Sequence, residues 1–402
     1  MGKKLFSLGE FSKYHIFLFL VPLFNMMSGY VQRDIILENK KTKNENEEEK
    51  QFYRKFEFSY LIITLFSKLF SGFLIIISKY LINKEHISYI LVQTRSRRRY
   101  HLNVNANNKY KIFFYILIIT TLELVVKIEN NLSLTKKNLI DIKLGFTIFV
   151  PLLSYFLLKT KYYKHHFVSI GIDLFGFIFI ILALISEEEE EEKHPYYIHL
   201  IHFSFSFPFS LSLILIKYLF MHYFIKPFTY LFIDGILCVI LSFLYILIKY
   251  ILILNDIDLF KNNIINIFLI FNNADTGVIL LFILIIILTF LYHVAKTVSL
   301  YFFSPTLFVM TDILSPVMTW IIDKIYKKIR NNEKLDIKVS IFKIIGYFFM
   351  IIACILFNEV IICNFWNLDY YTNKQIEERG IEDAVINANN SVSNNDTIIS
   401  ES

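Results

Sequence analysis

The sequence predicts an all-α membrane protein with ten transmembrane helices, arranged as two inverted five-helix repeats. The first observation is composition: hydrophobic residues fill 55% of the 402 positions and charged residues 19%, against roughly 25% charged in a typical soluble domain. The second is the mean hydropathy of +0.51, concentrated in runs that approach the ~20 residues a helix needs to cross a bilayer. The third is an acidic segment that divides these runs into two equal sets.

Ten apolar runs define the predicted spans. They lack the short alternation of apolar and polar residues that is typical of membrane β-strands, so we predict helices. In chain order, the predicted spans are 14–36, 58–82, 111–128, 138–158, 166–186, 197–222, 227–254, 276–302, 305–326 and 339–363.

The acidic segment SEEEEEEK at residues 186–193 lies near the middle of the chain. Consecutive glutamates without spaced ligands define no cation geometry, so we predict a solvated linker. The resulting units are a first five-helix half (1–186), an acidic linker (187–196), a second five-helix half (197–363) and a polar, Asn-rich tail (364–402). We expect the tail to be disordered. Two sets of five spans are typical of inverted repeats in transporters.

Loop charges orient these spans. Residues 83–110 contain TRSRRRYH, and the positive-inside rule places such a loop in the cytosol. With ten spans, the tail at 364–402 then lies in the cytosol and the linker at 186–193 in the lumen. The basic loop DKIYKKIRNNEKLDIK after the ninth span opposes this orientation, because it would face the lumen.

The ninth predicted span carries a polar stripe. Its members are Asp312, Ser315, Pro316, Thr319 and Asp323. Their spacing places them on one face of a helix. A charge at the centre of a bilayer costs a few kcal/mol on insertion scales, so this face must point at other helices or at water. We therefore expect Asp312 in the interior, paired with Lys68 or Lys296.

Charged side chains interrupt other spans. Lys68 lies near the middle of the second span, His293 and Lys296 share a face of the eighth, and Lys217 follows a serine-rich stretch of the sixth. Lysines near span ends can also extend to the headgroups, and a histidine can simply bond a neighbouring helix. Glu123 in the third span has a lysine four residues later, with which it can pair locally.

The sequence lacks the motifs of enzymes and metal sites. No nucleotide-binding loop, metalloprotease helix or nucleophile elbow occurs. His165 and His166 have no carboxylate at ligand spacing, and the three cysteines show no metal-like spacing. We therefore predict no enzyme activity, no metal and no cofactor. The net charge of +6 is interpreted as loop charge beside lipid headgroups and not as a nucleic-acid surface.

Short segments in nearly all spans resemble one transporter family. They are SGYV, EFSYLIITLFSKLFSGF, IKLGFTIFVPLLS, IKPFTYLFIDG, YHVAKTVSLYFFSPT and ILFNEVI. In this order they resemble the drug/metabolite transporter superfamily, and most closely the F-type branch of solute carrier family 35. The resemblance implies a ten-helix carrier in an intracellular membrane. It does not transfer a substrate, because Phe308 and Ser315 stand where an arginine is expected and Lys68 stands where an acidic residue is expected.

The predicted function is a secondary carrier that moves a small polar or anionic metabolite by alternating access. The candidate substrate-binding residues are Lys68, Lys217, His293, Lys296, Asp312, Ser315 and Thr319. The lysines would attract the anion, and Asp312 would pair with a lysine until substrate displaces it; a titrating Asp312 would instead couple transport to protons. The alternative is a non-transporting scaffold or receptor on a carrier fold. The expected partners are the bilayer and a small molecule, with a homodimer as a further option and no nucleic acid.

Overall fold

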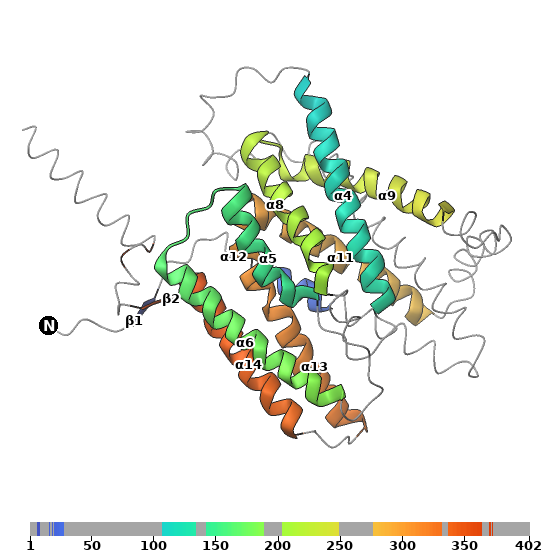
Figure 1. The fold of residues 1–402 in the computed structure, drawn as a ribbon. Helices are drawn as coiled ribbons and strands as arrows, with labels where there is room; N and C mark the ends of the chain where they lie inside the picture. The colour runs from blue at the N-terminus through green and yellow to red at the C-terminus, as the bar shows by residue number, and fades with distance from the viewer. Residues whose placement is uncertain are drawn as a thin grey trace, which may run out of the picture.

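The structure, a computed structural model, consists almost entirely of helices in the part of the chain that it describes (Figure 1). The described residues are 6–8, 16, 18, 20–27, 107–133, 142–188, 203–248, 276–331, 337–363, 370 and 372. The predicted second span with Lys68, most of the acidic linker and nearly all of the tail at 364–402 lie outside these residues.

The described elements follow the predicted spans from the third onward. The helices are α4 Asn107–Ser133, α5 Ile142–Leu157, α6 Lys164–Glu188, α8 Ser206–His222, α9 Pro227–Leu247, α11 Thr276–Phe302, α12 Pro305–Asp312, α13 Leu314–Asn331 and α14 Ile337–Phe357. Residues 20–27 of the predicted first span are also helical. The strands β1 Phe6–Leu8 and β2 Ile361–Cys363 form a two-stranded antiparallel ribbon.

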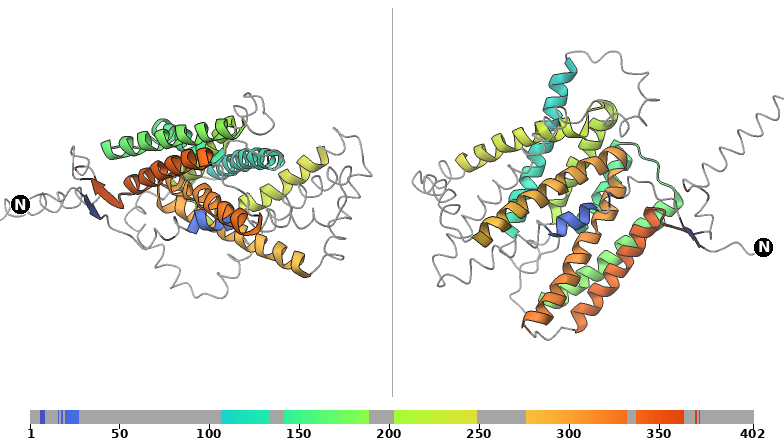
Figure 2. Two further views of the ribbon diagram at one scale, coloured as in Figure 1. Left: turned by 90° about the horizontal axis from the view of Figure 1, so that it is seen from below. Right: turned by 180° about the vertical axis from the view of Figure 1, so that it is seen from behind.

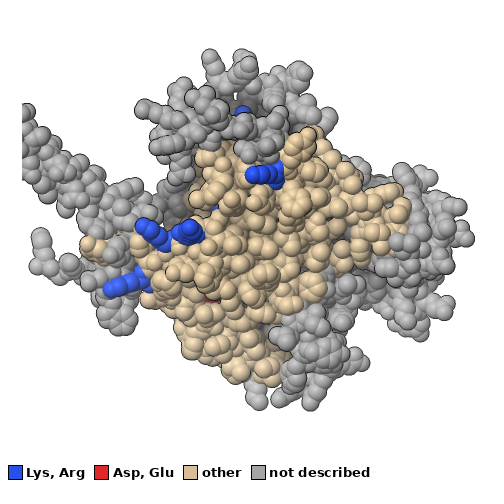
Figure 3. Space-filling view, turned by 45° about the horizontal axis from the view of Figure 1, so that its top comes forward, with Lys and Arg blue, Asp and Glu red and all other residues tan. Residues whose placement is uncertain are grey.

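Five stretches of the described helices are long and apolar enough to cross a membrane by length and composition. They are Lys164–Ser186, Pro227–Tyr245, Ile283–Phe302, Pro305–Ile322 and Val339–Phe357. Figure 3 shows a face whose described surface is almost entirely uncharged, with basic side chains at a few places. Together these features indicate a membrane-embedded helical protein. The count of ten spans and the inverted repeat stay predictions.

One predicted span contains a kink, and another extends beyond its helix. In the predicted ninth span at 305–326, α12 ends at Asp312 and α13 begins at Leu314, but the intervening Ile313 keeps helical dihedral angles. Pro316 accounts for the irregularity, because it has no N–H to donate to the Asp312 carbonyl one turn earlier. The predicted tenth span extends to 363, but α14 ends at Phe357 and is followed by a turn and β2.

Helices α6 and α14 lie side by side along their length (Figures 1 and 2). Glycines allow their backbones to approach: a Cβ on Gly176 would lie 2.7 Å from the Gly346 carbonyl oxygen, and a Cβ on Gly346 would lie 2.9 Å from that of Gly176. Close backbone approach through small residues is the usual way that membrane helices associate. The Ser169 hydroxyl adds a bond to the Ala353 carbonyl at 2.6 Å. The N-terminal end of α6 is thereby fixed near the C-terminal end of α14.

A second core joins α4, α5, α8, α9, α11 and α12. Its fully buried side chains include Ile116, Leu213, Ile216, Tyr230 and Phe308. Several polar side chains of α4, α9 and α11 are buried beside this core. These buried polar side chains form the candidate site.

Candidate functional site

A buried ion pair connects α4 and α11. The Lys296 ammonium lies 2.6 Å from the Glu123 carboxylate, and the two side chains are 4% and 5% exposed. The same ammonium lies 4.7 Å from the centre of the Phe209 ring on α8, within cation–π range. Because both charges lose their hydration, each depends on the other for neutralisation. The pair therefore fixes α4 against α11 only as long as both partners stay in place.

Asp234 on α9 belongs to the same polar layer. The Thr120 hydroxyl, one helical turn before Glu123, donates to the Asp234 carboxylate at 2.7 Å, and both residues are almost completely buried. The Tyr230 side chain on α9 is buried one turn before Asp234. Helices α4, α9 and α11 thus place two carboxylates and one ammonium in a single interior layer.

Asp312 is the last residue of α12, at the kink between α12 and α13 in the predicted ninth span. Asp312 is 4% exposed, and its carboxylate accepts a hydrogen bond from the Asn25 side-chain amide at 3.2 Å. Ser315 is also buried, while the Thr319 hydroxyl donates to the Ser315 carbonyl at 2.9 Å within α13. The expected interior position of Asp312 is thus found. Its candidate partner Lys296 is paired with Glu123, and the other candidate, Lys68, lies outside the described residues.

The remaining predicted residues separate into two groups. His293, 5% exposed, lies one helical turn before Lys296 on the inward face of α11 and joins the interior layer. The Lys217 ammonium instead donates to the carbonyls of Leu300 and Tyr301, at 3.0 and 3.1 Å. These carbonyls belong to the last turn of α11, where backbone carbonyls have no N–H partner within the helix. A cation there fills this role as a donor and interacts favourably with the negative end of the helix dipole. Lys217 therefore caps a helix, which its position in the sequence did not indicate.

A polar cluster that the sequence did not reveal joins the α5–α6 connection to α12. The Tyr162 and Thr306 hydroxyls lie 2.6 Å apart, and the Thr306 hydroxyl donates to that of Ser154 at 3.3 Å. Burial raises the pKa of the Tyr162 phenol above its ordinary value of 10.0. The phenol therefore stays neutral and holds the start of α12, while the Ser304 hydroxyl caps the same helix by accepting from the Leu307 amide.

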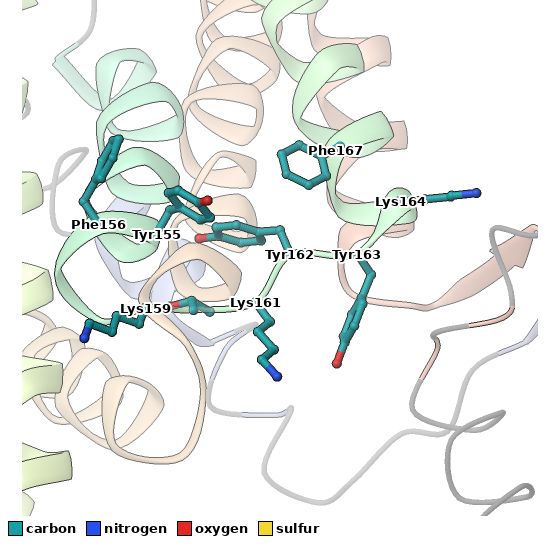
Figure 4. A pocket seen from close by; sticks show the side chains of 9 residues that line it. Tyr155, Phe156, Lys159, Lys161, Tyr162, Tyr163, Lys164 and Phe167 are labelled. Atoms are coloured by element: carbon teal, nitrogen blue, oxygen red, sulfur yellow. The ribbon is translucent and has the colours of Figure 1, made fainter.

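An open cleft of about 700 Å³ lies at the α5–α6 connection, and none of the predicted site residues that the structure describes lines it. Figure 4 shows its aromatic and lysine side chains around the loop that joins the two helices. It is lined by Tyr155, Phe156, Lys159, Thr160, Lys161, Tyr162, Tyr163, Lys164 and Phe167. Lysines beside aromatic rings at the end of apolar helices are typical of a membrane–water interface.

Comparison with known proteins adds no assignment. No model of a known protein family matches this chain, and no curated protein has a similar sequence. The carrier family that the short segments resemble therefore stays a prediction.

Proposed function

We propose that this protein is a secondary carrier that moves a small polar or anionic metabolite across an intracellular membrane by alternating access, as a relative of the drug/metabolite transporters. The observation that carries the proposal is the Glu123–Lys296 ion pair in the interior of an apolar helical protein. A buried pair often contributes no more to stability than well-packed apolar side chains of the same volume. Ionisable groups at such positions in membrane proteins mark the paths of substrates and ions.

The substrate's anionic group would take the place of Glu123 at the Lys296 ammonium. In the state described here, the ammonium is neutralised by Glu123 and lies against the Phe209 ring. An anion that binds Lys296 frees the Glu123 carboxylate, which then favours a different arrangement of α4 against α11. A ligand moves a conformational equilibrium by its difference in affinity for the two states, and the exchanged ion pair supplies that difference.

The kink between α12 and α13 adds a second buried charge to the proposal. Asp312 lies at this kink, and its carboxylate is bonded to Asn25 of the N-terminal helix. Acidic side chains that are buried among membrane helices mark the paths of substrates and ions. We place Asp312 and Ser315 beside the substrate path, and Thr319, His293 and Lys68 in supporting positions. Lys217 caps α11 and has a structural role in this proposal.

Flux into liposomes tests the proposal. A thermal-shift screen of purified protein against a metabolite library first finds a compound that raises the melting temperature, since a ligand that prefers the folded state stabilises it. Liposomes that contain the protein should then take up this compound with saturable kinetics. The double variant Glu123→Gln/Lys296→Met, which removes both charges of the pair together, should fold and lose the uptake.

A matched control separates charge inside the protein from charge at its surface. Lys161→Met removes an exposed lysine of the α5–α6 connection and should leave the flux unchanged. A scaffold or receptor would show no saturable flux of any compound, in the wild type as well as in the variants. That result would overturn the proposal in favour of the alternative.

A further inference from the structure

A second cluster of ionisable groups lies where α6 begins and α14 ends, outside the proposed carrier site. His165 and His166 belong to the first turn of α6, and Glu359 belongs to the turn after α14. One ligand atom from each residue can be chosen so that all three atoms lie within 4.8 Å of one another. Figure 1 shows the β1–β2 ribbon beside these two helix ends. The sequence did not reveal the cluster, because Glu359 comes from the other half of the chain.

His165 is buried without the bonds that a buried imidazole needs. The residue is 7% exposed, and neither of its ring nitrogens has a hydrogen-bond partner in the part of the chain that the structure describes. Its Nε2 lies 3.3 Å from the Glu359 carboxylate, close but without the alignment of a hydrogen bond. An unsatisfied buried polar group costs about 1–3 kcal/mol, so such groups in proteins call for an explanation such as a bound ion.

The distance between His165 and Glu359 suits a tetrahedral metal ion. Zn²⁺ binds imidazole nitrogen and carboxylate oxygen at about 2.0–2.2 Å, which separates neighbouring ligands by roughly 3.3 Å. The observed separation of Nε2 and Oε1 is 3.3 Å. A cavity of about 10 Å³ beside both residues has roughly the room of one water molecule. Its further lining residues are Val168, Leu356, Ile361, Ile362 and Thr372.

The turn that carries Glu359 is a helix cap. The φ of Glu359 is +53°, in the left-handed region that commonly follows the last residue of a helix. The Glu359 amide bonds the Leu356 carbonyl at 3.2 Å, and the Val360 amide bonds the Ile355 carbonyl at 3.0 Å, which is the pattern of a Schellman motif. The cap thus fixes the backbone from which the Glu359 carboxylate reaches His165.

His166 can complete the ligand set by exchanging one hydrogen bond. Its Nδ1 accepts from the Tyr163 amide at 3.1 Å, an arrangement that resembles a capping box at the start of α6. The His165 and His166 ring centres are 4.0 Å apart. A neutral imidazole has only one unprotonated nitrogen, and in His166 this nitrogen is Nδ1, which accepts from Tyr163. Whichever nitrogen binds the metal, Nδ1 can then no longer accept from the Tyr163 amide. Losing this hydrogen bond has a net cost of about 1 kcal/mol.

We propose that His165, His166 and Glu359 bind a Zn²⁺ ion, with water as a fourth ligand. Two imidazoles and one carboxylate with an open position form a ligand set that zinc accepts. The site lies where α6 begins and α14 ends, and the Glu359 side chain is 15% exposed. The bound ion would fix the N-terminal end of α6 to the C-terminal end of α14. Unlike the carrier site, it has no part in substrate binding.

Metal analysis of the purified protein tests this site. The chain is purified through a tag without histidine, equilibrated with Zn²⁺ and desalted, and its zinc is measured by mass spectrometry. We expect about one zinc ion per chain, which coordination to a folded site holds through desalting. His165→Ala and Glu359→Gln should each weaken zinc binding about ten-fold or more.

Two further measurements keep the result decisive. His222→Ala removes a histidine that stacks on Tyr218 with ring centres 4.1 Å apart, and it should retain zinc. If a site variant fails to fold, Co²⁺ bound to the wild type should show the strong visible absorption of tetrahedral coordination and lose it when Zn²⁺ is added. No zinc on the wild type, or equal zinc on the wild type and both site variants, would show an ordinary His–Glu ion pair and overturn the proposal.

Discussion

The Glu123–Lys296 pair and the His165–Glu359 pair differ in how far the protein itself satisfies their charges. In the interior, Glu123 and Lys296 lie 2.6 Å apart with a ring beside the ammonium. At the helix ends, His165 and Glu359 lie 3.3 Å apart, and the imidazole nitrogens have no hydrogen-bond partner among the described residues. The two interior side chains are only 4% and 5% exposed, so their charges must neutralise each other in this state. At a helix end, a ligand from solution can complete the site. We call Glu123–Lys296 the closed pair, because its two charges satisfy each other, and the His165–His166–Glu359 cluster the open site.

The largest expected effect comes from removing one partner of the closed pair. Lys296→Met leaves Glu123 buried without its cation, and removing one partner of a buried pair typically costs about 3–5 kcal/mol. We expect a large fall in the melting temperature in detergent and in the yield of folded protein. Glu123→Gln/Lys296→Met should recover most of the loss, because the two changes remove a single interaction. A double variant as unstable as the sum of the single variants would show that the two residues act independently.

The sequence indicated Glu123 and Lys296 of the interior layer on α4, α9 and α11, but not that they pair with each other. Apolar runs of the right length located the helices from the third span onward, because the bilayer imposes length and hydropathy on a span. Lys296 and His293 were candidate substrate-binding residues, although Lys296 could also have extended to the headgroups; both are buried. Partners depend on which helix faces which, however, and that order is set by packing over the whole chain. Glu123 was therefore assigned a lysine on its own helix, whereas its carboxylate bonds Lys296 of α11.

The open site was less predictable for the same reason. The spacing of His165 and His166 is visible in the sequence, but their carboxylate comes from a turn after α14. The close contact of Gly176 with Gly346 aligns the two helices so that these ends meet. Small residues spaced along two apolar runs could have indicated that α6 and α14 pack together. Nothing in the sequence indicated the left-handed turn at Glu359.

The next largest effect tests how the open site is aligned. Gly176→Leu forces a side chain against the Gly346 carbonyl oxygen, which would lie 2.7 Å from the new Cβ. Overpacking of this kind costs about 1–3 kcal/mol. We expect a lower melting temperature and, because the ends of α6 and α14 move apart, weaker zinc binding. Gly171→Leu is the matched control, since a Cβ there meets no atom within 4 Å; equal loss in both variants would contradict the role of the close contact.

A moderate effect is expected from the second bond of the interior layer. Thr120→Val keeps the shape of the side chain but removes the donor to Asp234, which lies 2.7 Å away. Losing a hydrogen bond to a buried charged group costs about 1.5–3 kcal/mol. The melting temperature should fall, while Thr121→Val, whose exposed hydroxyl bonds only the Leu117 carbonyl of its own helix among the bonds described, should change it little. Equal effects would place Asp234 outside the stabilising layer.

The smallest expected effect concerns Tyr162 in the α5–α6 connection. Tyr162→Phe removes the bond to the Thr306 hydroxyl and should cost about 1 kcal/mol. Burial raises the pKa of this phenol above its ordinary value of 10.0, so the unfolded chain releases the proton first. Its contribution to stability is therefore constant below pH 10 and falls as the pH rises further. Melting curves from pH 8 to 11 should show a smaller loss for Tyr162→Phe than for the wild type; identical profiles would contradict the burial of the phenol.

The most direct test of the central claim, that the Glu123–Lys296 pair receives the substrate, is the ligand-induced shift of melting temperature in two proteins. The wild type and the double variant Glu123→Gln/Lys296→Met are melted over a range of concentrations of the stabilising metabolite. We predict a shift that grows with concentration in the wild type and is absent from the folded double variant. The same shift in both proteins would contradict the claim, because the metabolite would then bind elsewhere.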